Sequence, residues 1–187
     1  MKVLEVDTTA DETGLVSKAQ TGDREAFGEL VHCYRVRVIN VVYHMCGDAN
    51  LAEDAAQEAF IRAWQHLLDF QPHSSFRNWL YRIAVNTALD ISRRERPDVD
   101  VESLELASPG ENIEADLEQQ ERSRQIRQAV LGLPQASRGV LILREYEGLS
   151  YREIAETLDI SIGTVMSRLN YARTRLAEIL RPLMEGR

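Results

Sequence analysis

The chain has 187 residues, of which 44% are hydrophobic and 28% charged, the composition of a globular protein with one or two domains. Its net charge of −8 argues against a uniformly basic nucleic-acid binder, and its two cysteines are too few for a disulfide framework. The sequence contains neither a basic-then-apolar leader nor an apolar run of about 18 residues. We therefore expect a cytoplasmic protein without direct membrane insertion.

The acidity is concentrated in the middle of the chain. Nine acidic residues and no lysine or arginine lie between Pro97 and Glu121, and the rest of the chain has a net charge of +1. Proline, glycine and serine also gather here, which is typical of a linker. The flanking parts can therefore carry local basic faces. The isolated chain should still bind DNA weakly, because non-specific affinity comes from phosphate neutralisation.

Apolar residues recur at spacings of three and four almost throughout, and no stretch alternates convincingly, so we expect an all-α protein. A short helix should stop at Gly22, and Asp23 and Gly47 should bound a long one. Asn50 and Glu53 have the form of a capping box for a helix running to about Phe70. The later helices are expected at residues 74–96, 113–131, 135–147 and 151–158 and after Ser161.

The helix expected at residues 74–96 has two unlike sides. Its apolar stripe consists of Phe76, Leu80, Ile83, Thr87 and Ile91. Amides and guanidiniums occupy another side, with two aromatic residues near its edges: Asn78, Arg82, Asn86, Arg93, Trp79 and Tyr81. Such a surface suits a phosphate backbone and unstacked bases. The alternative is an ordinary solvated helix face.

The C-terminal part has the pattern of a helix-turn-helix. Ser150 and Glu153 form a second capping box, and a short turn leads to a helix capped by Ser161. Apolar residues of that last helix fall on one arc, whereas Ser167 and Asn170 point away from it. An outward face of small polar groups flanked by arginines is typical of a recognition helix in a major groove. A helical hairpin that merely packs is the alternative.

Three sequence motifs together resemble the extracytoplasmic-function group (group IV) of the sigma-70 family. They are DAAQEAF from Asp54, WLYRIAVN from Trp79 and LSYREIAETLDISIGTVMSRL from Leu149. The resemblance covers roughly residues 14–181. It implies two small helical domains joined by an acidic linker: an N-terminal tail (1–13), a sigma-two-like domain (14–96), the linker (97–117) and a sigma-four-like helix-turn-helix domain (118–187).

The resemblance also implies the function and its residues. The chain would bind core RNA polymerase at the clamp helices of the largest subunit and at the flap, through Asp54, Gln57, Glu58 and Arg62 on the clamp side. It would recognise and melt the downstream promoter element with Phe70, Arg77, Trp79, Arg82, Ile83, Asn86, Arg93 and Arg94. It would read the upstream element with Thr164, Met166, Ser167, Arg168, Asn170 and Arg173. Met166 stands where the family often has a basic residue. An anti-sigma factor is a further implied partner.

Other functions remain open from the residues. Glu53, Asp54 and Glu58 could form a carboxylate set, but no nucleophile, phosphate loop or histidine at ligand spacing accompanies them, so we expect no catalysis, cofactor or metal. Cys33, Cys46, His32 and His44 suggest a zinc or redox sensor, although they spread along one helix. A free-standing helix-turn-helix regulator would leave WLYRIAVN and DAAQEAF unexplained. Whether the acidic linker also blocks DNA is a further hypothesis.

Overall fold

The computed structural model describes the backbone of residues 9–71, 75–94 and 113–185. Within these ranges all regular secondary structure is helical, which confirms the all-α prediction. The helices are α1 (Thr9–Gln20), α2 (Arg24–Cys46), α3 (Ala49–Gln65), the 3-10 turn η1 (Leu67–Asp69), α4 (Phe76–Arg94), α5 (Ile113–Leu131), α6 (Gln135–Glu145), α7 (Tyr151–Leu158) and α8 (Ile162–Glu185). None of them is long and apolar enough to cross a membrane.

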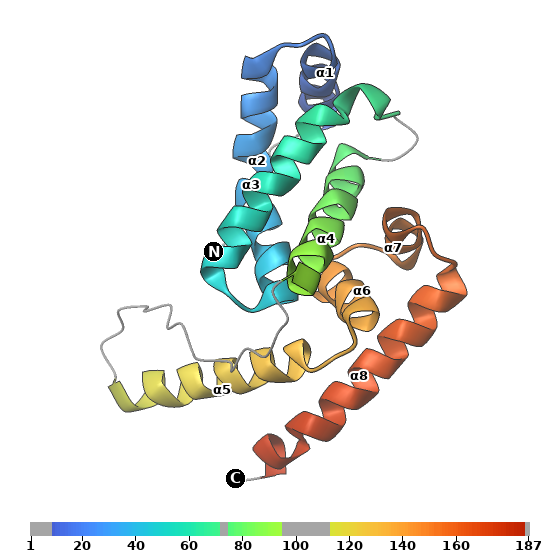
Figure 1. Cartoon of the computed structure of the whole chain (residues 1–187). Coiled ribbons are helices and arrows are strands. Elements are labelled where there is room, and N and C mark those ends of the chain that lie inside the picture. Colours follow the sequence, from blue (N-terminus) through green and yellow to red (C-terminus); the bar gives the residue numbers. More distant parts are fainter. Residues whose placement is uncertain (1–8, 72–74, 95–112, 186–187) are drawn as a thin grey trace.

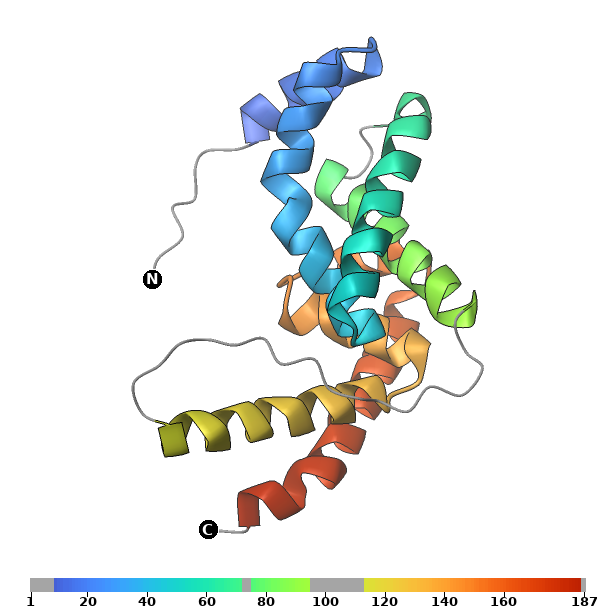
Figure 2. The same ribbon diagram turned by 60° about the vertical axis from the view of Figure 1, so that its left-hand side comes forward.

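The helices form two groups that share a border. Helices α1 to α4 make one bundle, and α6 and α7 lie against it beside the lower part of α4 (Figure 1). The long helix α8 packs on α6 and α7 and continues past α5 (Figures 1 and 2). The buried apolar side chains of both groups form one continuous cluster. Residues 97–112, where most of the acidic linker was predicted, lie outside the described residues.

Local capping sets most helix boundaries. The Asp23 carboxylate accepts the N–H groups of Glu25 and Ala26 at the start of α2. Gly47 ends that helix with φ of 84°. A Cβ at Gly47 would also approach Leu131 Cδ1 to 2.4 Å, which the end of that side chain would have to relieve by moving, so the left-handed backbone is the main reason for glycine here.

The sequence-based cap of α3 was wrong by two residues. Asp48, not Asn50, accepts the first free N–H groups, those of Asn50 and Leu51. Asp48 has extended backbone, whereas Asn50 already lies inside the first turn. The helix also ends at Gln65 rather than near Phe70.

Helix α4 is buried on two sides instead of one. Helices α2 and α3 cover its apolar stripe, and α7 covers part of the opposite side. As a result Tyr81 is fully buried and Asn78 is only 4% exposed. The prediction that Asn78 and Tyr81 lie on a solvent-facing side was therefore wrong. The sequence of α4 alone cannot show this burial, because the covering residues come from the C-terminal part of the chain.

Arg138 is the principal polar link between the two helix groups. This arginine of α6 is 4% exposed. Its guanidinium donates to the carbonyl oxygens of Met45 near the end of α2, of Leu131 at the end of α5 and of Leu133 just after α5. Helix C-termini leave carbonyls without intrahelical partners, so one side chain satisfies groups from two helix ends.

We expect Arg138→Gln to lower the free energy of unfolding by about 3 kcal/mol, because a shorter amide leaves buried carbonyls unsatisfied. Urea unfolding followed by circular dichroism measures the change. The matched control is Arg152→Gln, which removes an exposed ion pair with Glu156 and should cost less than about 0.5 kcal/mol. Equal effects of the two substitutions would contradict the role of Arg138.

Candidate functional site: a docking face and two nucleic-acid surfaces

The predicted polymerase-binding residues lie on α3. Asp54 and Gln57 are exposed, and Glu58 is half-buried. Arg62 pairs with Glu58 at 2.8 Å and with Asp90 of α4 at 2.9 Å. The hydrogen bonds that Arg62 donates to Asp90 and Glu58 raise the pKa of Arg62 above its usual value. Arg62 therefore ties α3 to α4 as well as contributing charge to the surface.

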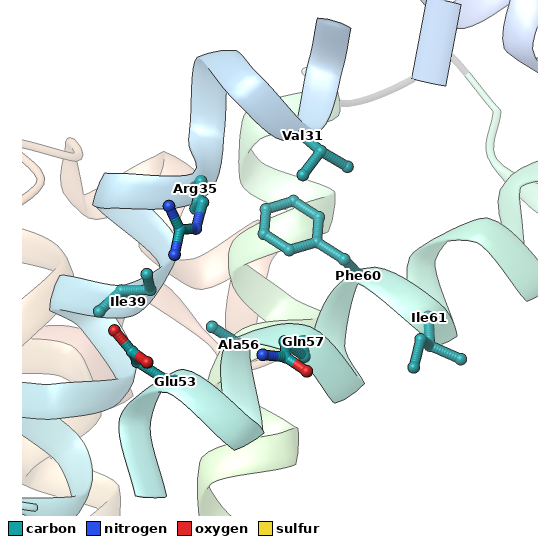
Figure 3. Close-up of a pocket in the computed structure, with 8 residues that line it drawn as sticks. All are labelled: Val31, Arg35, Ile39, Glu53, Ala56, Gln57, Phe60 and Ile61. Atoms are coloured by element: carbon teal, nitrogen blue, oxygen red, sulfur yellow. The ribbon is translucent and has the colours of Figure 1, made fainter. Parts of the chain in front are cut away.

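A groove beside these residues was not found from the sequence. It is a cavity of about 300 Å³ between α2 and α3, lined by Val31, Arg35, Ile39, Glu53, Ala56, Gln57, Phe60 and Ile61. In Figure 3, Phe60 reaches from α3 toward α2 between Val31 and Arg35. The α2 wall of the groove consists of Val31, Arg35 and Ile39, which recur every four residues and so lie on one side of the helix. This spacing could have indicated the groove from the sequence. Apolar walls with charged groups at the rim suit a protein partner.

The predicted downstream-element residues fall into two sets along α4. Phe70, which follows η1 and precedes α4, is buried, with its ring centroid 5.9 Å from that of Phe76 and 5.1 Å from that of Trp79. Asn86 is exposed and lies seven residues, about 10 Å of helix rise, beyond Trp79. The structure thus places Phe70 in an aromatic cluster and does not bring it beside Asn86. Ile83 is half-buried.

The basic residues of α4 are distributed unevenly. Arg82 and Arg93 are exposed and Arg77 is half-buried, whereas the side chain of Arg94 lies outside the described residues. Two of these arginines contact acids of the C-terminal helices. Arg77 Nη2 lies 2.9 Å from Glu153 Oε1, and Arg82 Nη2 lies 3.4 Å from Asp159 Oδ2. Two arginines predicted to contact DNA therefore form ion pairs with residues of the same chain.

Neighbouring contacts extend this border. The buried Tyr81 hydroxyl donates to Glu147, and burial and that carboxylate raise the pKa of Tyr81. Farther along, the rings of His44 and Tyr146 lie 3.9 Å apart between centroids. The border therefore joins aromatic packing to charge-assisted hydrogen bonds.

Glu153 has two roles at the border. It completes the predicted capping box of α7, where its carboxylate accepts the backbone N–H of Ser150 at 2.8 Å. Hydrogen bonds from the Ser150 backbone and hydroxyl lower the pKa of Glu153, and the Arg77 charge lowers it further. The carboxylate is therefore ionised at neutral pH, and while its Oε2 caps α7, its Oε1 pairs with an arginine of α4.

The predicted helix-turn-helix consists of α7 and α8. Asp159 makes the turn with φ of 54°, and the Thr164 N–H donates to the Ser161 hydroxyl at 3.1 Å. Val165, Leu169 and Ala172 are buried, as predicted. Met166, Ser167, Asn170 and Arg173 are exposed, whereas Thr164 and Arg168 are half-buried. Arg173 pairs with Glu145 of α6 at 2.7 Å.

The zinc or redox sensor finds no support in the part of the chain that the structure describes. That part holds no group of three or more histidine, cysteine or acidic side chains placed to bind a metal. Cys33 is exposed. Cys46 Sγ lies 3.8 Å from the carbonyl oxygen of Ala88, thirteen residues and about 20 Å along α2 from Cys33.

Comparison with known proteins agrees with this geometry. Sigma-70 region 2 matches residues 30–97 and Sigma-70 region 4 matches residues 123–176. The RNA polymerase sigma-H factor of Pseudomonas aeruginosa is 38% identical, over 95% of this chain and 97% of its own length. The ECF RNA polymerase sigma factor SigW of Bacillus subtilis is 35% identical, over 90% of this chain and 96% of its own.

A solved structure shows the same arrangement over most of the chain. CnrH, in complex with the cytosolic domain of CnrY, superposes with a TM-score of 0.71 and 28% identity over 92% of this chain and 98% of its own. The fold is that of a promoter-recognition factor with a region 2 and a region 4. The chain belongs to the sigma-70 family and to its extracytoplasmic-function group. Sigma factors are non-enzymatic initiation factors, so the enzyme alternative is excluded, and region 2 accounts for the motifs that a free-standing regulator would leave unexplained.

Proposed function

We propose that this sigma factor directs core RNA polymerase to promoters through three distinct surfaces, on a sigma-two-like domain (14–96) and a sigma-four-like domain (118–187). The observation that carries the proposal is that the groove between α2 and α3 is separate from both nucleic-acid helices, α4 and α8. Polymerase and DNA can therefore be bound together. The distribution of charge supports this, since acids lie on α3 while arginines gather on α4 and α8.

The docking face consists of Asp54, Gln57, Glu58 and the groove beside them. The clamp helices of core polymerase bind this face, and one of their apolar side chains fills the groove against Phe60 and Ile61. Asp54 and Gln57 provide the polar rim. Arg62 acts mainly by holding Glu58 in place, because it pairs with Glu58 and with Asp90 of α4. The C-terminal domain makes the second polymerase contact, at the flap.

Region 2 recognises and opens the downstream element. Asn86 is exposed and hydrogen-bonds a base edge, and Arg82 and Arg93 neutralise phosphates. Phe70, Trp79 and Ile83 provide the apolar floor for unstacked bases, and Arg77 contacts the nucleic-acid backbone. Arg94 extends the basic surface. Region 4 reads the upstream element with the N-terminal half of α8.

The packed arrangement of the two regions is the idle state of the molecule. Glu153 and Asp159 form ion pairs with Arg77 and Arg82, the arginines that would otherwise bind DNA phosphates. Simultaneous contact with two promoter elements therefore requires α7 to leave α4. The exposed Arg82–Asp159 pair is weak in water, at about 0–1 kcal/mol, and the half-buried Arg77–Glu153 pair is still reached by solvent, so DNA phosphates can compete with both.

An anti-sigma factor controls the active form in the cytoplasm. CnrH was solved with the cytosolic domain of CnrY, and RpoE of Bartonella quintana with the anti-sigma factor NepR. The second of these is 23% identical to this chain, with a TM-score of 0.64 over 83% of it, and supports the fold alone. A partner of this kind would stabilise the idle state by binding it in preference to the open one.

We expect Ile61→Asp to weaken binding to core polymerase at least about tenfold, because it places a charge in the apolar groove. Val36→Asp is the matched control, since Val36 is 68% exposed on α2 and does not line the groove. Binding is measured by fluorescence anisotropy with labelled protein. Equal affinities of the two variants would exclude the groove as the docking site.

Run-off transcription with bacterial core polymerase on a pool of promoter-length duplexes tests the function itself. Specific starts should appear only when this protein is added. With the promoter so found, Asn86→Ala should bind core polymerase normally but lose strand opening, measured by permanganate reactivity of unpaired thymines. Gln128→Ala, another exposed amide, on α5, is the control. Normal opening by Asn86→Ala would refute the base-contact assignment.

A further inference from the structure

An exposed apolar pair lies at the start of α8. Ile162 is 47% exposed and Met166 is 54% exposed, although the helix buries Val165 and Leu169 on its other side. Residues four apart lie on the same edge of a helix, so Ile162 and Met166 form a continuous apolar strip. The N-terminal end of α8 lies beside α7 (Figure 1). This strip therefore belongs to the part of the helix-turn-helix that faces a DNA groove.

The polar groups around the strip are largely used inside the protein. The Thr164 hydroxyl lies 2.9 Å from the Ser161 hydroxyl, and the Ser167 hydroxyl donates to the Thr164 carbonyl at 3.1 Å. The Arg173 guanidinium donates to Glu145. Much of the hydrogen-bonding capacity of the first turns thus goes to capping and internal contacts. The side chains most free to reach outward there are Met166, Ile162 and the exposed Asn170.

The charge of α8 indicates DNA rather than a protein as the occupant of this strip. From Ile162 to Ala177 the helix contains three arginines and no acidic residue. The apolar edge continues directly into Asn170, four residues after Met166. In the major groove, the C5-methyl group of thymine is the apolar group on a base edge. An apolar strip in an acid-free, arginine-bearing helix matches that methyl group.

We propose that Met166, backed by Ile162, reads thymine methyl groups in the upstream promoter element. The inference rests on the proposed function, because it assigns a base contact to the region 4 surface. Asn170, about 6 Å farther along the helix, is positioned to pair with a neighbouring adenine. Specificity at the thymine comes from removing two apolar surfaces from water rather than from a hydrogen bond.

Single thymine-to-uracil replacement tests the proposal, since it removes only the methyl group. A promoter is first obtained by run-off transcription with the holoenzyme, and each thymine of its upstream element is replaced in turn. Loss of one buried methyl should weaken holoenzyme binding about three- to fivefold at one or two positions. With Met166→Ala, thymine and uracil promoters should bind equally. Ile179→Ala, a 40% exposed apolar residue far along the same helix, should keep the full discrimination.

Two results would overturn the methyl contact. Equal binding of thymine and uracil promoters by the parent holoenzyme would exclude it, as would unchanged discrimination in Met166→Ala. Loss of anti-sigma binding by Met166→Ala with unaltered thymine discrimination would assign the strip to a protein partner instead. Absence of any specific transcript would be a failure of the proposed function itself, so the two failures are distinguishable.

Discussion

The packing of α4 between two groups of helices is the constraint on which the rest of the structure depends. Helices α2 and α3 bury one side of it, and α7 covers another. Its residues therefore belong at once to the core of region 2 and to the border with region 4. Tyr81 shows this dual position, because it is fully buried and its hydroxyl reaches Glu147. Any movement between the two regions must change the surroundings of α4.

The border contains weak and strong parts. Its outer edge consists of the Arg77–Glu153 and Arg82–Asp159 pairs, which water screens and salt weakens. Its inner part is apolar and includes Gly139, where an added Cβ would lie 3.7 Å from Val85. Arg138 fixes this inner part through buried carbonyls. Opening the molecule thus costs mainly the inner contacts, and the energy of binding polymerase and promoter must offset them.

The sequence predicted features that depend on near neighbours. Asp23, Gly47 and the Ser150–Glu153 box mark helix ends through contacts within a few residues, and the structure has each of them. The inward arc of α8 was likewise correct, since helical periodicity alone determines it.

Features that join distant segments were missed. Burial of Asn78 depends on α7, and the groove near Phe60 depends on how α2 crosses α3. The ion pairs of Arg77 and Arg82 join residues more than 70 positions apart. An amphipathic pattern predicts the apolar side that a helix buries. It does not predict that another helix also covers the polar side. The roles of the site residues were inferred from motif resemblance and stay predictions.

The distance between α2 and α8 tests the central claim, that the regions are packed in the idle protein and separate on a promoter. Spin labels at the exposed Cys33 and at Ala177→Cys, with Cys46→Ala, report it by pulsed electron resonance. A pair at Cys33 and Gln65→Cys, within region 2, serves as the control. The account predicts one narrow distribution of distances in the free protein and a longer distance with core polymerase and promoter, while the control pair stays constant. The same α2–α8 distance in both states would contradict it.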